Sequence, residues 1–156
     1  MPKSVEESPQ PTGDSAGGPD VILDFIFDDG LLFIAVQNIG DKPAYKVSVE
    51  FDKSFRGVEG TRAVSELPLF RNIEFLAPWK EIVTFLDTSA SYFARGEPTR
   101  IKATVSYRDA SRRRHSAAIT HDLNIYCEIG YVRKTGDPTA PCKFGAQSEE
   151  VEKCQL

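Results

Sequence analysis

Two histidines, His115 and His121, carry the side chains in this sequence best suited to acid–base or metal chemistry near neutral pH. They are six residues apart on a predicted strand, so both face the same side of it. Six strand residues span about 20 Å, too far for one metal ion, and no third ligand follows at a useful spacing. No serine or cysteine nucleophile accompanies either histidine in a recognisable motif. We therefore expect no metal, no cofactor and no enzyme activity, with His121 at the edge of the core and His115 exposed in a turn.

Three cysteines, Cys127, Cys142 and Cys154, follow the last dense apolar segment. Their spacing does not match the paired C-x-x-C ligands of zinc sites, and an odd number leaves one thiol unpaired in any disulfide scheme. Three alternatives stay open: free thiols in a reducing compartment, a tail disulfide in an exported protein, or a metal or redox role. In each case Cys127 is the cysteine best placed to be buried.

Arg112, Arg113 and Arg114 form the densest run of charge, and the strands predicted on either side place the run at a hairpin tip. Guanidinium groups there could bind an acidic protein patch, a phosphate or a nucleic-acid backbone. The alternative is a solvated turn that keeps a β-protein soluble. No aromatic residues are interleaved with the arginines, and the chain carries a net charge of -4, which argues against nucleic acid.

Aromatic residues outside the predicted strands are the other candidate binding groups. Trp79, Tyr92 and Phe93 fall in or near loops, where aromatic side chains can anchor a partner surface. Trp79 or Tyr92 could also stack on a sugar. The alternative is that these rings close the two open ends of a β-sandwich.

The elements that would position these groups are strands, because the dominant hydrophobic period is two. Val47, Val49 and Phe51 alternate with polar residues, which is typical of a half-buried strand. Turn signals separate the strands, such as the glycine and aspartates at 28–30. The predicted strands are 22–27, 31–36, 44–51, 73–75, 81–86, 101–108 and 116–123. This pattern predicts an all-β protein, an immunoglobulin-like antiparallel β-sandwich of about seven strands.

Composition divides the chain into three parts. Residues 1–20 are rich in proline and glycine, so they predict a disordered leader that buries too little apolar area to offset its chain entropy. Residues 21–133 form the predicted sandwich, in which 52–69 is an ambiguous connection that forms an edge strand or covers one end. Residues 134–156 lack a period and predict a mobile, cysteine-containing tail.

Charge and hydropathy limit the location. Lys and Arg number 19 against 23 Asp and Glu, and no segment has the roughly 20 apolar residues that a membrane-spanning helix needs. The start of the chain lacks the apolar core of a signal peptide. We expect no membrane insertion and a cytoplasmic location by default, the alternative being a soluble fragment of an exported or membrane-anchored protein.

Several turn and strand-start patterns resemble a known family. Residues 34–40 end in Asn38-Ile39-Gly40 and are followed by an Ala-x-x-Val pattern at 44–47; Ala77-Pro78 and the 106–109 stretch add to it. Across about residues 21–124 the chain resembles bacterial and archaeal immunoglobulin-like, adhesion-related domains of the CARDB type. Trp79 stands where those relatives usually have glycine. The resemblance implies a binding or structural role and supplies no catalytic residues.

These observations lead to one functional expectation and one alternative. We expect a non-catalytic protein-binding or assembly module whose partner is another protein, since sandwiches offer loops and strand edges to partners. The alternative is a sandwich that binds a carbohydrate or another small ligand. The pattern leaves the oligomeric state open.

Overall fold

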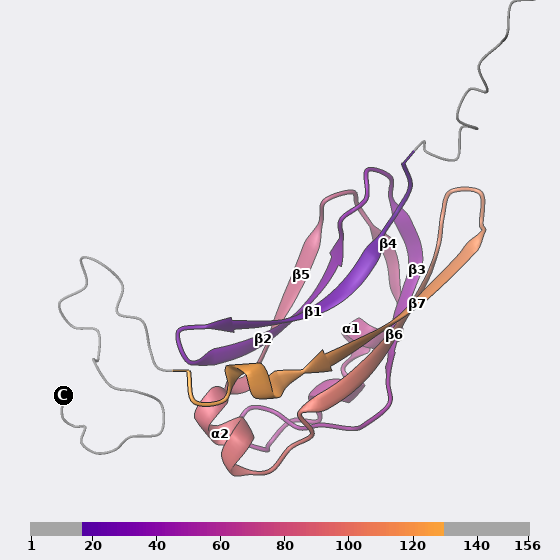
Figure 1. The fold of residues 1–156 in the computed structure, drawn as a ribbon. Helices are drawn as coiled ribbons and strands as arrows, with labels where there is room; N and C mark the ends of the chain where they lie inside the picture. The colour runs from indigo at the N-terminus through magenta and orange to yellow at the C-terminus, as the bar shows by residue number, and fades with distance from the viewer. Residues whose placement is uncertain (1–16, 130–156) are drawn as a thin grey trace, which may run out of the picture.

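The computed structural model describes residues 17–129, which form seven antiparallel strands and four short helical segments (Figure 1). The strands are β1 (Val21–Asp28), β2 (Leu31–Asn38), β3 (Ala44–Phe51), β4 (Ile73–Leu76), β5 (Glu81–Thr88), β6 (Arg100–Arg108) and β7 (Arg114–Asp122). The helical segments are η2 (Val64–Glu66), α1 (Pro68–Arg71), α2 (Ser89–Ala94) and η3 (Leu123–Tyr126). One sheet has the order β1-β2-β5 and the other β4-β3-β6-β7. The predicted all-β sandwich is confirmed.

The core lies between the two sheets and follows the alternation predicted from the sequence. In β6, Ile101, Ala103 and Val105 are completely buried, while their neighbours in the strand are turned outward. Leu23 and Phe25 of β1 face them from the three-stranded sheet. Burying an aliphatic side chain of this size stabilises a fold by about 1.5–3 kcal/mol, so the alternation holds the sheets together.

β3 departs from strict alternation at one point. Ala44 and Val47 are both completely buried although they are three residues apart. The pairing of β3 with β6 shifts register between Tyr45 and Ser48, as at a β-bulge, which places an extra residue in one strand. Lys46 takes a positive φ of 52° within this irregularity. As a result, Tyr45 and Lys46 both lie outside the core.

The end of the sandwich that carries α2 is closed by the 52–72 segment and by a buried ion pair. Arg95 Nη2 lies 2.7 Å from Asp87 Oδ2, and the Asp87 side chain is almost completely buried. Val58 N donates to the Leu86 carbonyl oxygen (2.8 Å), so the 52–69 connection covers this end, one of the two predicted alternatives. The sequence pattern missed α2, where Thr88 Oγ1 accepts a capping hydrogen bond from the backbone of Ser91 (3.1 Å).

The opposite end is organised around one buried amide, that of Asn38. Its Oδ1 accepts hydrogen bonds from the backbone N–H groups of Asp20 (3.1 Å) and Gly40 (3.0 Å). Its Nδ2 donates to the carbonyl oxygens of Lys42 (2.8 Å) and Leu76 (3.2 Å). The side chain is completely buried, and every donor and acceptor site that it needs to fill is filled. Asn38 therefore joins the start of β1, the β2–β3 loop and the end of β4.

Gly40 is required by this arrangement. A Cβ atom on Gly40 would lie 2.0 Å from the carbonyl oxygen of Gly18, far inside van der Waals contact. Ile39 N also donates to the Asp20 carbonyl oxygen (2.8 Å). Residues 17–20, the last part of the predicted leader, thus lie against the β2–β3 loop, whereas the rest of that leader and the predicted 134–156 tail fall outside the described residues.

Replacing Asn38 should destabilise the protein because its four backbone partners would lose their hydrogen bonds in a buried site. We expect Asn38→Ala to lower the free energy of unfolding by at least about 2 kcal/mol, measured by urea denaturation. The matched control is Asn72→Ala at an exposed asparagine, which should stay within about 0.5 kcal/mol of the wild type. Equal effects of the two substitutions would contradict the account.

Candidate functional site

The turn between β6 and β7 is built by the carboxylate of Asp109. Its Oδ1 accepts hydrogen bonds from the backbone N–H groups of Ser111 (2.8 Å) and Arg113 (3.0 Å). Its Oδ2 lies 2.9 Å from His115 Nε2. Arg112, at the tip, takes a positive φ of 64°. The arginine run is therefore held on an ordered turn.

Charge and stacking reinforce this turn. The hydrogen bond from His115, together with those from the backbone of Arg113 and Ser111, holds the pKa of Asp109 below its ordinary value. The His115 ring stacks on Tyr107, with ring centroids 5.2 Å apart and an interplanar angle of 15°. His115, expected to be an exposed turn residue, is instead a half-buried partner of Asp109.

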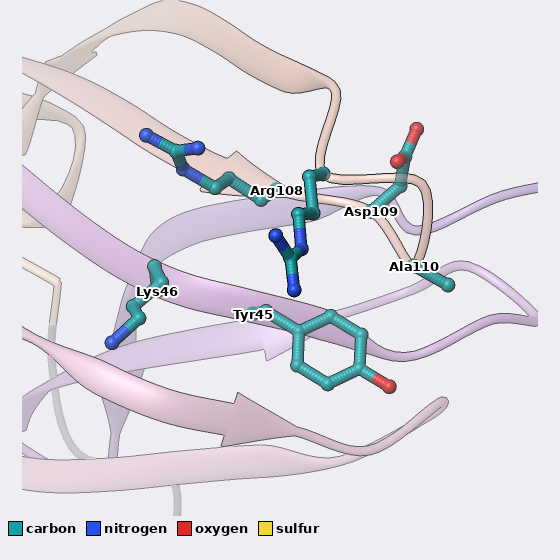
Figure 2. A pocket seen from close by; sticks show the side chains of 6 residues that line it. Tyr45, Lys46, Arg108, Asp109 and Ala110 are labelled. Carbon is teal, nitrogen blue, oxygen red and sulfur yellow. The ribbon is translucent and has the colours of Figure 1, made fainter.

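A hollow of about 570 Å³ lies beside this turn, on the outer face of β3 and β6 (Figure 2). Its lining consists of Tyr45, Lys46, Arg108, Asp109, Ala110 and Arg112. The bulge in β3 supplies the first two of these residues, and the end of β6 with its turn supplies the others. We call this hollow the hairpin pocket.

The hairpin pocket has a positive charge balance. Three of its six lining residues are cationic, namely Lys46, Arg108 and Arg112. The Asp109 carboxylate points away from the Tyr45 ring and is occupied by the turn (Figure 2). Lys46 pairs with Glu74 at 2.8 Å, but both side chains are more than half exposed, so this pair adds little stability and can rearrange.

An aromatic pair adds an apolar surface next to the cations. The Tyr45 and Phe75 rings meet edge to face, with centroids 5.5 Å apart. Phe75 is 55% exposed, an unusual position for a phenylalanine on a strand of only four residues. A ligand in the hairpin pocket would therefore meet cations and an aromatic surface together.

Two residues that line the hairpin pocket have an unusual backbone conformation. Lys46 and Arg112 both take positive φ angles, which cost a residue with a Cβ about 1–3 kcal/mol. Strained residues persist where the surrounding structure holds them, and they occur frequently at binding sites. Within residues 17–129, five other non-glycine residues also take positive φ angles. The two strained residues here are also two of the pocket's three cations.

The sequence-predicted binding residues fall in different places. Arg112 lines the hairpin pocket, whereas Arg113 and Arg114 are exposed but do not line it. Trp79 is 67% exposed in the β4–β5 turn. Tyr92 and Phe93 lie on α2 at the opposite end of the sandwich (Figure 1). The structure thus separates the arginines from the α2 aromatic residues.

The two aromatic residues of α2 belong to the interior. Tyr92 has no exposed surface, and its hydroxyl donates to the Pro98 carbonyl oxygen (2.5 Å). Burial raises the pKa of Tyr92 above its ordinary value. Phe93 packs partly buried against the core and meets Tyr92 edge to face. These rings close one end of the sandwich, which was the alternative to a binding role.

Sequence reasoning missed Tyr45, Lys46 and Arg108 as site residues. The first two were assigned to a regular strand, where only a bulge brings both to one side. A signal was present, since Ala44 and Val47 are apolar residues spaced by three within a segment of period two. Arg108 carried no signal beyond its place before the turn.

The remaining titratable and nucleophilic groups do not form a second site in the described part of the chain. His121 packs edge to face on Phe25 at 5.0 Å, at the edge of the core as predicted, and burial lowers its pKa. Cys127, expected to be the cysteine best placed to be buried, is exposed just after η3. Cys142 and Cys154 lie outside the described residues. Residues 17–129 contain no cluster of three or more His, Cys, Asp or Glu able to hold a metal ion.

A second exposed surface lies on the three-stranded sheet. Phe33 and Phe85 meet edge to face across β2 and β5 on the outer side, and Val83 and Leu31 are also exposed there. The surface that these four side chains form is apolar. It has none of the convergent charge of the hairpin pocket.

Comparison with known proteins gives one match. A family model described as a domain of unknown function (DUF8453) matches residues 4–127, most of the chain. No curated protein and no solved structure matches. The resemblance to CARDB-type domains therefore stays a prediction. None of the described helices is long and apolar enough to cross a membrane.

The link between Asp109 and His115 gives a pH-dependent prediction. Because the pKa of Asp109 is lower in the folded protein than its ordinary value of 3.8, its ionised carboxylate stabilises the folded turn at pH values above 3.8. This stabilisation is lost as the pH falls through the lower pKa of the folded state. We expect the Asp109 carboxyl carbon to titrate by NMR with a midpoint below 3.8. In His115→Phe, which keeps a ring on Tyr107 but removes the hydrogen bond, the midpoint should rise towards 3.8. An unchanged midpoint would show that His115 does not set this pKa.

Proposed function

The chain belongs to the DUF8453 family, whose function is unknown, and from this premise we propose that it is a non-catalytic protein-binding module whose hairpin pocket receives an acidic segment of a partner protein. The observation that carries the proposal is that three cations, Lys46, Arg108 and Arg112, line one hollow together with Tyr45. Arginine is the side chain best suited to bind a carboxylate through two parallel hydrogen bonds.

The available charge supports a carboxylate ligand. Among the described residues, neither Arg108 nor Arg112 has an acidic partner within ion-pair distance. Arg108 also lies directly opposite Arg114 in the β6–β7 ladder, so two like charges are neighbours. A carboxylate placed in the pocket would relieve this repulsion and gain charge-assisted hydrogen bonds.

The charges of the site and the aromatic surface beside it favour a protein ligand over the other ligand classes. Catalysis by paired carboxylates would need a second titratable acid beside Asp109, and the lining contains none. Nucleic acid favours a longer run of cations, and the chain as a whole is acidic, with a net charge of -4. Tyr45 and Phe75 supply apolar area for a neighbouring side chain of a peptide.

A carbohydrate-binding module is the second candidate, and one observation favours it. Trp79 is the most exposed of the large apolar side chains in the described residues, and it takes a positive φ of 62°. An exposed indole held on a turn can stack on a sugar ring. In this alternative, Trp79→Ala abolishes glycan binding while substitutions in the hairpin pocket leave it unchanged.

The first test measures binding of a short Glu- and Phe-rich peptide by NMR titration of the full chain. We expect shifts at the amides of Tyr45, Arg108 and Arg112, and affinity that falls as salt is raised. In Arg108→Ala/Arg112→Gly the dissociation constant should rise at least about tenfold. Glycine at 112 accepts the positive φ, so this substitution removes the cation while keeping the turn.

The matched control is Arg71→Ala, at an exposed arginine of α1 outside the pocket, which should bind the peptide as the wild type does. A Gln- and Phe-rich peptide controls for the carboxylates and should bind weakly. Equal binding by the double variant and the wild type would contradict the proposal. Stronger binding of a single-stranded oligonucleotide than of the acidic peptide would assign the pocket to nucleic acid instead.

A further inference from the structure

β7 is a long sheet edge whose central part lacks the features that usually protect one. It has nine residues and pairs only with β6, in a regular register without a bulge. Its central residues, from Ser116 to Thr120, are small or apolar and uncharged, and they include neither proline nor glycine. Exposed edges of this kind accept another strand, so proteins normally shorten, charge or cover them.

Each of the other three edges of this sandwich is either short or covered at one point. β4 has only four residues. The edge of β5 is capped where the Val58 N–H donates to the Leu86 carbonyl oxygen. The edge of β1 receives the Tyr126 hydroxyl, which donates to the Phe25 carbonyl oxygen (3.1 Å). Within residues 17–129, β7 thus differs from every other edge strand.

The backbone groups that β7 leaves unpaired can be identified from the ends of its ladder with β6. Leu123 N donates to the Thr99 carbonyl oxygen (2.7 Å), and Asp109 N donates to the Arg113 carbonyl oxygen (3.1 Å). Hydrogen bonding alternates along an antiparallel strand, so the odd-numbered residues of β7 face β6. The even-numbered residues turn their N–H and C=O groups to the open edge. They are Arg114, Ser116, Ala118, Thr120 and Asp122.

We propose that this edge pairs with β7 of a second copy of the chain, antiparallel and centred on Ala118. In that register Ala118 lies opposite Ala118 of the second copy, and Ser116 lies opposite Thr120. All the unpaired backbone groups of both strands then meet, since residues of the same parity face each other. Two four-stranded sheets become one continuous sheet of eight strands.

Charge complementarity selects this register. Arg114 comes opposite Asp122 of the second copy, and the two-fold symmetry makes the pair twice. Asp122 Oδ1 already accepts two hydrogen bonds from Asn124 (3.0 and 2.9 Å), while in the described part of the chain Oδ2 has no partner. Arg114 lies opposite Arg108 within its own sheet. The Asp122 carboxylate of the second copy would reduce the repulsion between these two arginines.

On the core-facing side of β7, two apolar side chains remain at least partly exposed to water, and the second copy would cover them. The register opposite β6 places Ala117 and Ile119 on the inner side, across from Val105 and Ala103. Ala117 is nevertheless exposed and Ile119 only half-buried. In the proposed pairing each Ile119 lies opposite Ala117 of the other copy. The larger side chain then covers the smaller one, and apolar area leaves water at both positions.

This inference goes beyond the proposed function and does not depend on it, because the pocket uses β3 and the β6–β7 turn whereas pairing uses the free edge of β7. The test is the mass of the full chain by sedimentation over a range of concentrations. We expect a dimer of twice the chain's 17.3 kDa. Arg114→Glu and Asp122→Lys should each raise the dimer dissociation constant at least about tenfold, and the double variant should restore dimerisation.

Two further variants keep the result interpretable. Ala118→Pro removes an N–H that does not bond to β6, so the monomer should keep its circular dichroism spectrum while dimerisation is lost. Arg71→Glu, the same charge change at an exposed site off β7, should dimerise as the wild type does. A wild-type chain that stays monomeric at all concentrations would overturn the proposal. So would single variants that dimerise normally, and a double variant that stays monomeric would overturn the register.

Discussion

The arrangement of one whole end of this sandwich depends on a single buried amide. Asn38 forms its four hydrogen bonds with the backbone of three separate segments, at residue 20, residues 40–42 and residue 76. A buried polar side chain is stable only when it is fully hydrogen-bonded, so the three segments must take one relative position. That position fixes the β2–β3 loop that leads into β3, and the bulge that turns Tyr45 and Lys46 outward lies in the first half of that strand, where β3 pairs with β6.

The two ends of the sandwich have different roles. At the α2 end, Asp87 pairs with Arg95, and the Tyr92 hydroxyl donates to the Pro98 carbonyl oxygen. These polar groups therefore stabilise the closed end of the core. At the opposite end, two cations with positive φ lie at irregular points of the backbone: Lys46 at the β3 bulge and Arg112 on the β6–β7 turn. Binding residues usually occur on turns and irregular segments held by a sheet scaffold. Pairing through β7 would bring two hairpin pockets into one dimer. A two-fold axis perpendicular to the joined sheet keeps both outer faces on the same side, so a dimer would present two hairpin pockets to one partner and gain avidity.

The fold was predictable from the sequence, whereas most of the site was not. Period-two alternation located β3 and β6, and apolar runs bounded by turn signals located the other five strands, all to within about two residues. Alternation works where one face of a sheet is buried and the other is wet, because the pattern directly reports this. Arg112 was identified from charge density alone. Tyr45 and Lys46 were not, because the β3 bulge depends on pairing with β6, a contact between residues about sixty positions apart. Tyr92 and Trp79 looked alike in the sequence, both being aromatic residues near loops. Only the tertiary packing of α2 buries one and leaves the other exposed.

The most direct test of the role of Asn38 is native-state hydrogen exchange at the two amides that donate to its side chain, those of Asp20 and Gly40. Both lie in loop segments, where exchange is ordinarily fast. If Asn38 holds this end as described, both amides exchange only on global unfolding, at the slow rates of the central strand β6. Exchange at the rate of an unstructured peptide would contradict the account, because the pocket would then stand on a mobile loop.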